Sequence, residues 1–117
     1  MIEGSEPLFP AAVRHGDLLL LSGQAPIDPA TGALCADDFM GQATFVLDSI
    51  TRTLALAGAD VAGVLRVECI LADAADFGAW NELYARVFPP PRPARTSFVA
   101  SFVVPGMLLE VQVTAGL

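Results

Sequence analysis

The alternation of hydrophobic and polar residues changes its period several times along the chain, and each period predicts a different kind of element. Residues 11–14 and 17–23 are two short, mainly apolar segments that flank the turn-forming pair His15-Gly16. Apolar segments of this length around a glycine turn are typical of two paired β-strands. Segment 26–34 follows with prolines and a Thr-Gly pair, which predicts a turn-rich connection.

Helical periodicity begins at residue 39. Apolar residues recur there every three or four positions, which predicts a helix from residue 39 to 57 with a single apolar stripe. Asp37 or Asp38 can cap its N-terminus, and Gly58 suits the left-handed backbone position after its C-terminus. The stripe consists of Phe39, Ala43, Val46, Leu47, Ile50, Leu54 and Ala57.

A strand and a second helix follow. VLRVECIL, residues 64–71, is sufficiently apolar and β-branched to predict a strand. Asp73 and Asp76 suit the first turn of a helix. Pro89–Pro91 end that helix because proline lacks the N–H that a continuing helix needs. Its apolar stripe consists of Phe77, Trp80, Tyr84, Val87 and Phe88.

Two final strands are predicted near 96–104 and 108–114, and we expect them to pair about a turn at Pro105-Gly106. The order is then β-β-α-β-α-β-β, an α+β fold with one mixed sheet and two helices on one face. The other face still carries apolar side chains from every strand. We therefore expect another subunit to cover it.

The composition points the same way. A chain of 117 residues predicts a single domain, spanning 1–117. Hydrophobic residues make up 54% of it, and its mean hydropathy is +0.57. Because a folded chain of this mass exposes only about 6,000 Å², so apolar a sequence is difficult to bury in one subunit. The composition therefore favours a homo-oligomer.

Charge and cysteine usage limit the partners and the compartment. The net charge is −7 and no cluster of basic residues occurs, so neither a nucleic acid nor an anionic membrane is an expected partner. The N-terminus lacks a signal-peptide pattern. Cys35 and Cys69 lack the spacing of a redox pair, which favours free thiols in a cytoplasmic protein. His15 is the sole histidine, and we expect no metal and no cofactor.

Arg95 is the strongest candidate for chemistry. It follows PPPRP, residues 89–93, whose prolines restrict the backbone before it and fix its direction at little entropic cost. Its planar guanidinium matches a carboxylate and stays charged at every accessible pH. The alternative is an ion pair with one of the acidic residues. Arg92, inside the proline run, is expected to be a solvated loop residue.

Three further places carry candidate polar groups. Glu110 shares a strand face with Leu108 and Gln112. If a partner subunit covers that face, Glu110 is a half-buried functional carboxylate. If not, it is a solvent-facing glutamate on an edge strand. Ser22-Gly23-Gln24 either faces a ligand or satisfies a turn, and Asn81 either binds a ligand or is solvated. No serine or cysteine has a histidine partner. The expected chemistry is therefore the binding of a small anion and the positioning of a water.

Five segments, taken in order, resemble the RidA/YjgF family of enamine/imine deaminases from about residue 8 to residue 115. They are SGQAPIDPATGAL, QATFVLDSITRTLALAGAD, DFGAWNELYARVF, PARTSF and VPGMLLEVQV. The resemblance implies a chorismate-mutase-like homotrimer with clefts between its subunits. It also implies hydrolysis of 2-aminoacrylate and related 2-imino acids to 2-keto acids and ammonia, without a cofactor.

The resemblance further implies roles for single residues. Arg95 falls on the family's carboxylate-binding arginine and Glu110 on its water-positioning glutamate. Ser22, Asn81 and Ser97 fall on positions that line the substrate site, the last through its backbone.

The chain departs from the family in three places. Phe9 stands at a substrate-binding position where many members have tyrosine, so a hydroxyl is absent. Gln112 stands where a second glutamate is common. The stretch between Asn81 and Arg95 is shorter and rich in proline.

Geometry suggests how the site is shared. If the last two strands pair, Glu110 lies opposite Ser101, about 20 Å along the strand from Arg95. We therefore predict that Arg95 of one chain meets Glu110 of a neighbour. The main alternative function is a non-catalytic trimer that binds small carboxylate metabolites. A ribonuclease and a chorismate mutase are disfavoured because basic residues are scarce.

Overall fold

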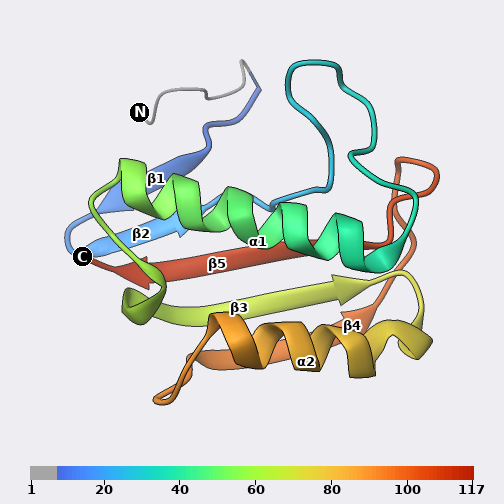
Figure 1. Cartoon of the computed structure of the whole chain (residues 1–117). Helices are drawn as coiled ribbons and strands as arrows, with labels where there is room; N and C mark the ends of the chain where they lie inside the picture. Colours follow the sequence, from blue (N-terminus) through green and yellow to red (C-terminus); the bar gives the residue numbers. More distant parts are fainter. Residues whose placement is uncertain (1–7) are drawn as a thin grey trace.

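Residues 8–117 are described by the computed structural model of this chain, and they form one five-stranded sheet with two α-helices packed against it (Figure 1). The order of strands and helices is the predicted one, with two short 3₁₀ helices, η1 and η2, added before β3 and α2. The elements are β1 (Ala12–His15), β2 (Leu18–Leu21), α1 (Phe39–Leu56), η1 (Val61–Gly63), β3 (Val64–Leu71), η2 (Ala74–Asp76), α2 (Phe77–Val87), β4 (Ala94–Val99) and β5 (Leu109–Gly116).

The sheet is mixed, as predicted, and its strand order is β1-β2-β5-β3-β4. β3 and β4 run parallel because helix α2 returns the chain between them, whereas every other neighbouring pair is antiparallel. β5 therefore lies at the centre of the sheet, and β1 and β4 form its edges.

The prediction that the last two strands pair with each other is wrong. The turn at Pro105-Gly106 does form, with the glycine at φ 82°, but it lies inside the connection 100–108, which carries the chain from the edge of the sheet to its centre. Glu110 is consequently opposite Ile70 on β3 and not opposite Ser101.

Several strand bounds differ from the prediction by one or two residues, and two strands end clearly earlier than predicted. The strand expected over 96–104 begins earlier and ends at Val99, because Val99 pairs with Leu71, where the neighbouring strand β3 ends. The strand expected over 17–23 ends at Leu21. The chain beyond each of these points leaves the regular ladder.

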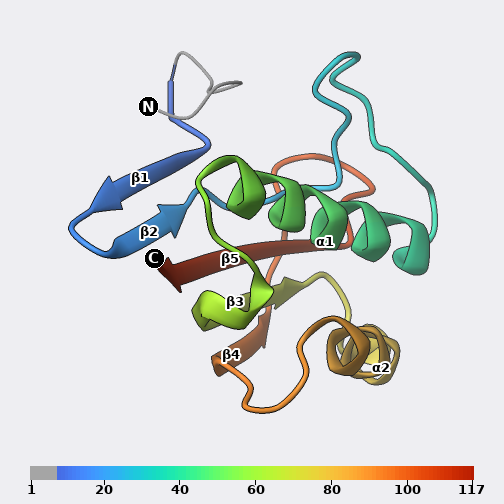
Figure 2. The same ribbon diagram turned by 60° about the vertical axis from the view of Figure 1, so that its left-hand side comes forward.

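Both helices lie on one face of the sheet, as predicted (Figures 1 and 2). Alternate residues of each strand point toward them, and in β5 these are the buried Leu109, Val111 and Val113. They pack with the apolar stripes of α1 and α2 into a single core, in which Leu54 and Trp80 are fully buried.

The ends of the helices are set by short-range hydrogen bonds. Asp38, and not Asp37, caps α1, because its carboxylate accepts a hydrogen bond from the backbone N–H of Gly41 at 3.2 Å. Gly58 follows the last turn of α1 with φ 79°, the left-handed conformation expected there. Asp73 caps η2 and so precedes helix α2 by one turn.

Neither helix covers the second face of the sheet (Figure 2). Val13, Leu20 and Phe98 are 52%, 45% and 47% exposed there. Strand register places Leu20 beside Val13, and Phe98 beside Ile70. We call this surface the open face. Neighbouring exposed apolar residues of this kind are typical of a surface on which another polypeptide packs.

Candidate functional site

Arg95 lies on the edge strand β4 and points to the helix side of the sheet, because its register partner is the buried Val67. Its guanidinium carbon lies 4.7 Å from the centre of the Tyr84 ring and 5.5 Å from that of Phe77, both on α2. Such contacts hold a cation in place without neutralising it. Within residues 8–117 no carboxylate pairs with Arg95, so the alternative of an ion pair is not found there.

The proline-rich approach to Arg95 folds back onto the end of helix α2. Arg92 is exposed, as expected of a loop residue, yet its side chain is anchored: Nε donates a hydrogen bond to the carbonyl of Phe88 at 2.7 Å. A cation at this end of a helix also interacts favourably with the helix dipole. The segment from the helix end to β4 is therefore held by a side-chain contact as well as by its prolines.

Four buried polar atoms on α2 and β4 have no conventional hydrogen-bond partner within the described residues, although the Cys69 thiol lies within hydrogen-bonding reach of the Trp80 and Ser97 side chains. Each such atom costs roughly 1–3 kcal/mol when it stays unpaired, which is why native proteins contain few of them. Asn81 and Tyr84, which carry the other two of these atoms, line the same pocket as Arg95. The atoms are Trp80 Nε1, Asn81 Oδ1, Tyr84 OH and Ser97 Oγ, all from α2 or β4.

An open pocket of about 300 Å³ lies beside this cluster. Ser97 borders a second, smaller hollow of about 180 Å³, together with Phe77. The structure thus brings three predicted residues, Arg95, Asn81 and Ser97, to the same edge of the sheet. The larger pocket is lined by Asn81, Tyr84, Ala85, Arg92, Pro93 and Arg95.

Burial governs ionisation in this region. Burial raises the pKa of the Tyr84 phenol above its ordinary value of 10.0, and the nearby Cys69 raises it as well. The positive charges of Arg95 and, to a smaller extent, Arg92 lower it. Burial also raises the pKa of the Cys69 thiol, which faces Ser97 across the β3–β4 ladder. Cys69 is therefore a neutral thiol at physiological pH and no ready nucleophile.

Glu110 lies on the central strand β5 and on the open face, since its neighbours Leu109 and Val111 are buried under the helices. It is half-buried, so it is not the solvent-facing edge residue that the sequence left possible. Its carboxylate packs directly on Gly23: a β-carbon at that position would lie 2.6 Å from Oε2. Only glycine leaves room for the carboxylate in this place.

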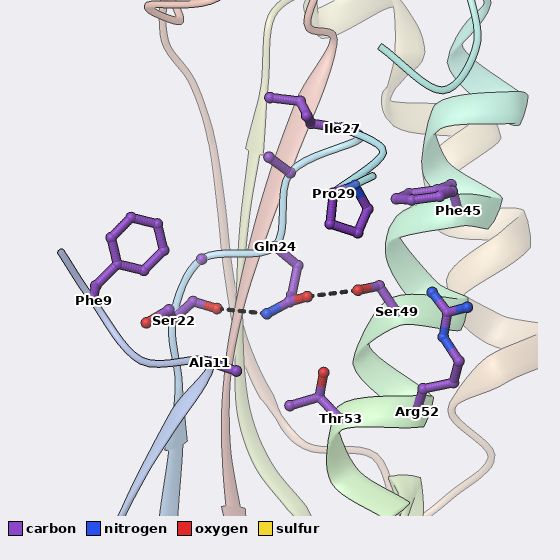
Figure 3. Close-up of a pocket in the computed structure, with 12 residues that line it drawn as sticks. Phe9, Ala11, Ser22, Gln24, Ile27, Pro29, Phe45, Ser49, Arg52 and Thr53 are labelled. Atoms are coloured by element: carbon purple, nitrogen blue, oxygen red, sulfur yellow. Dashed lines mark hydrogen bonds between the residues drawn. The ribbon is translucent and has the colours of Figure 1, made fainter. Parts of the chain in front are cut away.

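Gln24 holds the segment after β2 beside Glu110. Its backbone pairs with that of Val111 through hydrogen bonds of 2.7 and 3.1 Å. Its side chain donates to the carbonyl of Ser22 at 3.0 Å and accepts from Ser49 Oγ on α1 at 2.8 Å (Figure 3). The sequence allowed this segment either to face a ligand or to satisfy a turn, and the amide of Gln24 does the second.

Ser22 and Phe9 line a pocket of about 350 Å³ between this segment and helix α1 (Figure 3). The hydroxyl of Ser22 donates to the carbonyl of Pro10 at 2.6 Å, so its proton is already engaged and only its oxygen can accept from a ligand. The opposite wall comes from α1 residues that the sequence pattern did not single out: Phe45, Ser49, Arg52 and Thr53.

Gln42 is a positioning residue that sequence reasoning missed. It is fully buried on α1, donates to the carbonyls of Ala36 and Gly106 at 3.0 and 2.9 Å, and accepts from the N–H of Leu108 at 2.8 Å. It thereby fixes the entry into β5 just before Glu110. Gln42 lies three residues after Phe39 and four before Val46, which places it on the apolar stripe, and this spacing is the signal that could have indicated its burial.

The predicted residues therefore form two groups that do not meet within one chain. Arg95, with Asn81 and Ser97, lies at the β4 edge on the helix side, whereas Glu110 lies on the open face beside Gly23. Strand β3 separates them, and the registers differ by three residues, since Arg95 pairs with Val67 and Glu110 with Ile70. At about 4.8 Å per strand and roughly 3.3 Å per residue, the two Cα atoms are about 14 Å apart.

Residues 8–117 contain neither a cluster of metal ligands nor a membrane-spanning helix. No group of three or more histidine, cysteine, aspartate or glutamate side chains could hold a metal ion in this range. No helix in the same range is both long and apolar enough to cross a membrane.

The chain is similar to a set of known proteins. Residues 4–117 match the protein family described as Endoribonuclease L-PSP. A RutC family protein of Pyrococcus horikoshii is 35% identical over 107 residues, which are 92% of this chain and 85% of that protein. The 2-iminobutanoate/2-iminopropanoate deaminase of Mus musculus is 30% identical over 107 residues, covering 92% of this chain and 79% of that protein. The solved Rid-family protein YyfA of Yersinia pestis has a TM-score of 0.89 at 29% identity, covering 96% of this chain and 90% of that one.

Proposed function

The chain belongs to the Endoribonuclease L-PSP family, which includes the RutC and RidA/YjgF proteins, and from this membership we propose that it hydrolyses small 2-imino acids and their enamine tautomers to 2-keto acids and ammonia. A relative at 30% identity carries the name of an imine deaminase. The proposed substrates are of the 2-aminoacrylate type, and the reaction uses no cofactor. The two free cysteines fit a cytoplasmic enzyme.

The observation that carries the proposal is that the guanidinium of Arg95 has no carboxylate partner among the described residues. The guanidinium packs near the rings of Phe77 and Tyr84, and no acidic residue among those described neutralises it. A substrate carboxylate supplies the missing partner through two parallel N–H···O bonds. Asn81, which lines the same pocket, supplies a side-chain amide for the imine nitrogen.

The hydrolysis itself needs a positioned water and a proton carrier. Glu110 takes a proton from water as the oxygen adds to C2 of the imine, and the proton passes to the nitrogen. The C2–N bond of the resulting carbinolamine then breaks as the proton of its hydroxyl passes through Glu110 to the leaving nitrogen. The products are the keto acid and ammonia. A carboxylate within hydrogen-bond reach of the water is the group that such a general-base step requires.

Because Arg95 and Glu110 are separated in one chain, the complete site combines Arg95 of one subunit with Glu110 of another. The proposed assembly is a homotrimer in which the open face and the edge strand β4 pack against neighbouring copies. The exposed apolar residues of the open face supply a reason for association.

The proposal is tested with imines generated in place by an amino-acid oxidase, while keto-acid release is followed. We expect wild-type protein to accelerate release and Arg95→Ala to lose the acceleration. Arg86→Ala is the matched control, since Arg86 is exposed on the same helix and outside the pocket. Equal release with wild type, Arg95→Ala and no protein would rule the activity out.

The same experiment separates the proposed enzyme from a non-catalytic trimer that binds small carboxylates. That alternative predicts saturable, Arg95-dependent binding of a 2-keto acid without any imine turnover. RNA cleavage, which the family description suggests, has less support in this chain. A protein with six basic and thirteen acidic residues lacks the basic surface that RNA binding requires.

A further inference from the structure

A second arginine shares the pocket of Arg95. Arg92 and Arg95 both line the open pocket of about 300 Å³ at the end of helix α2, together with Asn81 and Tyr84. The sequence placed only Arg95 at a binding site, whereas the fold brings the two guanidinium groups to one hollow.

Arg92 is held so that part of its guanidinium remains available. Its Nε donates to the carbonyl of Phe88 at 2.7 Å, which fixes the side chain and leaves the two terminal nitrogens for other acceptors. Within the described residues no carboxylate pairs with Arg92 or with Arg95. Two like charges around one small pocket repel each other, and the repulsion is relieved when anionic groups bind there.

Tyr84 lines the same pocket and is close to both arginines. Both Arg95 and Arg92 lower the pKa of this phenol, against the larger effect of burial, so both are close enough to act on the same atom. The Tyr84 ring is buried and its hydroxyl has no partner among the described residues.

From this geometry we infer that the pocket selects 2-imino acids with a second carboxylate on a short side chain, that is, imines of acidic amino acids. Arg95 binds the carboxylate next to the imine and Arg92 binds the one on the side chain. This inference rests on the proposed imine hydrolysis and narrows its substrate class. A monocarboxylate leaves one guanidinium uncompensated, whereas a dicarboxylate pairs with both.

The test compares two imine substrates and three proteins. An acidic amino-acid oxidase supplies the dicarboxylic imine and a general amino-acid oxidase supplies a monocarboxylic one. Wild type should show the lower KM for the dicarboxylic imine. Arg92→Gln should raise that KM about ten-fold more than the KM for the monocarboxylic imine, because a charge-assisted pair of about 1.4 kcal/mol corresponds to ten-fold. Arg86→Gln should preserve both values.

A binding measurement keeps the inference independent of turnover and of folding defects. Calorimetry with a stable 2-keto dicarboxylate and a 2-keto monocarboxylate should show a preference for the dicarboxylate in wild type. Arg92→Gln should abolish the preference and Arg92→Lys, which keeps the charge, should retain part of it. Circular dichroism verifies that the variants are folded.

The possible outcomes separate the two proposals. Turnover of the monocarboxylic imine without a preference for the dicarboxylate, or a preference that survives Arg92→Gln, overturns the two-arginine inference and leaves the imine hydrolysis standing. Arg92-dependent dicarboxylate binding without any turnover overturns the hydrolysis alone. Inorganic phosphate that competes as well as the keto dicarboxylate would also overturn the inference, because the pocket would then be a general dianion site.

Discussion

Gly23 occupies a position where any side chain would collide with the carboxylate of Glu110. A β-carbon there would lie 2.6 Å from Oε2, and the flexible end of the glutamate is the part that can yield. We expect Gly23→Ala to fold normally, since its backbone is not in the left-handed region, and to change the free energy of unfolding by less than about 1 kcal/mol. Activity should fall about a hundred-fold because the carboxylate is misplaced.

Gly78→Ala is the control for this substitution. A β-carbon on Gly78 would meet nothing within 4 Å, and alanine is the better helix former, so stability should rise by about 0.5–1 kcal/mol with activity retained. Steady-state imine hydrolysis and chemical denaturation measure both effects. Full activity of Gly23→Ala would show that the packing of Glu110 on this glycine is irrelevant to catalysis.

Tyr84 offers a second measurement at the residue scale, because it is the only tyrosine in the chain. Burial raises its pKa above 10.0, and Arg95 and Arg92 oppose the rise. Removal of one opposing cation in Arg92→Gln should therefore raise the pKa further. Ultraviolet titration of the phenol follows this directly. Since the folded-state pKa is the higher one, stability should decline as the pH rises above 10.0. A phenol that ionises at its ordinary pH would contradict the burial.

Single residues also show how far the sequence could be interpreted. The proline-rich approach singled out Arg95, because local stiffness and charge are visible in sequence. Its aromatic neighbours Phe77 and Tyr84, and the convergence of Arg92 on the same hollow, depend on how α2 packs beside β4. Neither fact has a local signature in the sequence, so the sequence alone predicts a solvated Arg92.

At the scale of elements, helix α1 depends on an N-terminal cap, for which the sequence offers two adjacent aspartates. Asp38 accepts the hydrogen bond from the N–H of Gly41, and Asp37 is exposed. Asp38→Ala should lower the free energy of unfolding by about 1 kcal/mol, and Asp37→Ala should change it far less. Denaturation at equal protein concentrations measures the difference. Equal losses in the two variants would mean that charge near the helix start matters, and not the hydrogen bond.

The elements themselves were largely predictable, whereas their pairing was not. The strand over 64–71 has the predicted bounds and the helix over 39–57 ends one residue earlier, because the periodicity of apolar residues is a local property. Strand partners are not encoded in that periodicity. The alternating pattern of β5 suits a hairpin with β4 as well as the central place it takes between β2 and β3. The prediction chose the nearer strand in sequence.

At the scale of the whole molecule, the two separated groups lead to a mixing experiment. Arg95→Ala and Glu110→Gln should each be inactive alone. Subunits mixed at random by unfolding and refolding together should regain activity at roughly one quarter of the sites, since each restored site needs one intact residue from each of two different chains.

Two control measurements are needed to interpret the mixing experiment. Wild type should have a native mass near three times the chain mass of 12.2 kDa. Each variant refolded alone should remain inactive at the same native mass. Mixed assemblies that stay inactive would mean that each site takes both residues from one chain, which would contradict the shared site.

The packing of Trp80 has a practical consequence. This residue is the only tryptophan in the chain, it is fully buried, and its ring centre lies 5.8 Å from that of Tyr84, against which Arg95 is held. Its fluorescence therefore arises from a single tryptophan packed against Tyr84, which lines the pocket beside Arg95. Entry of a carboxylate should alter that emission, so the unlabelled protein can report its own ligand occupancy in real time.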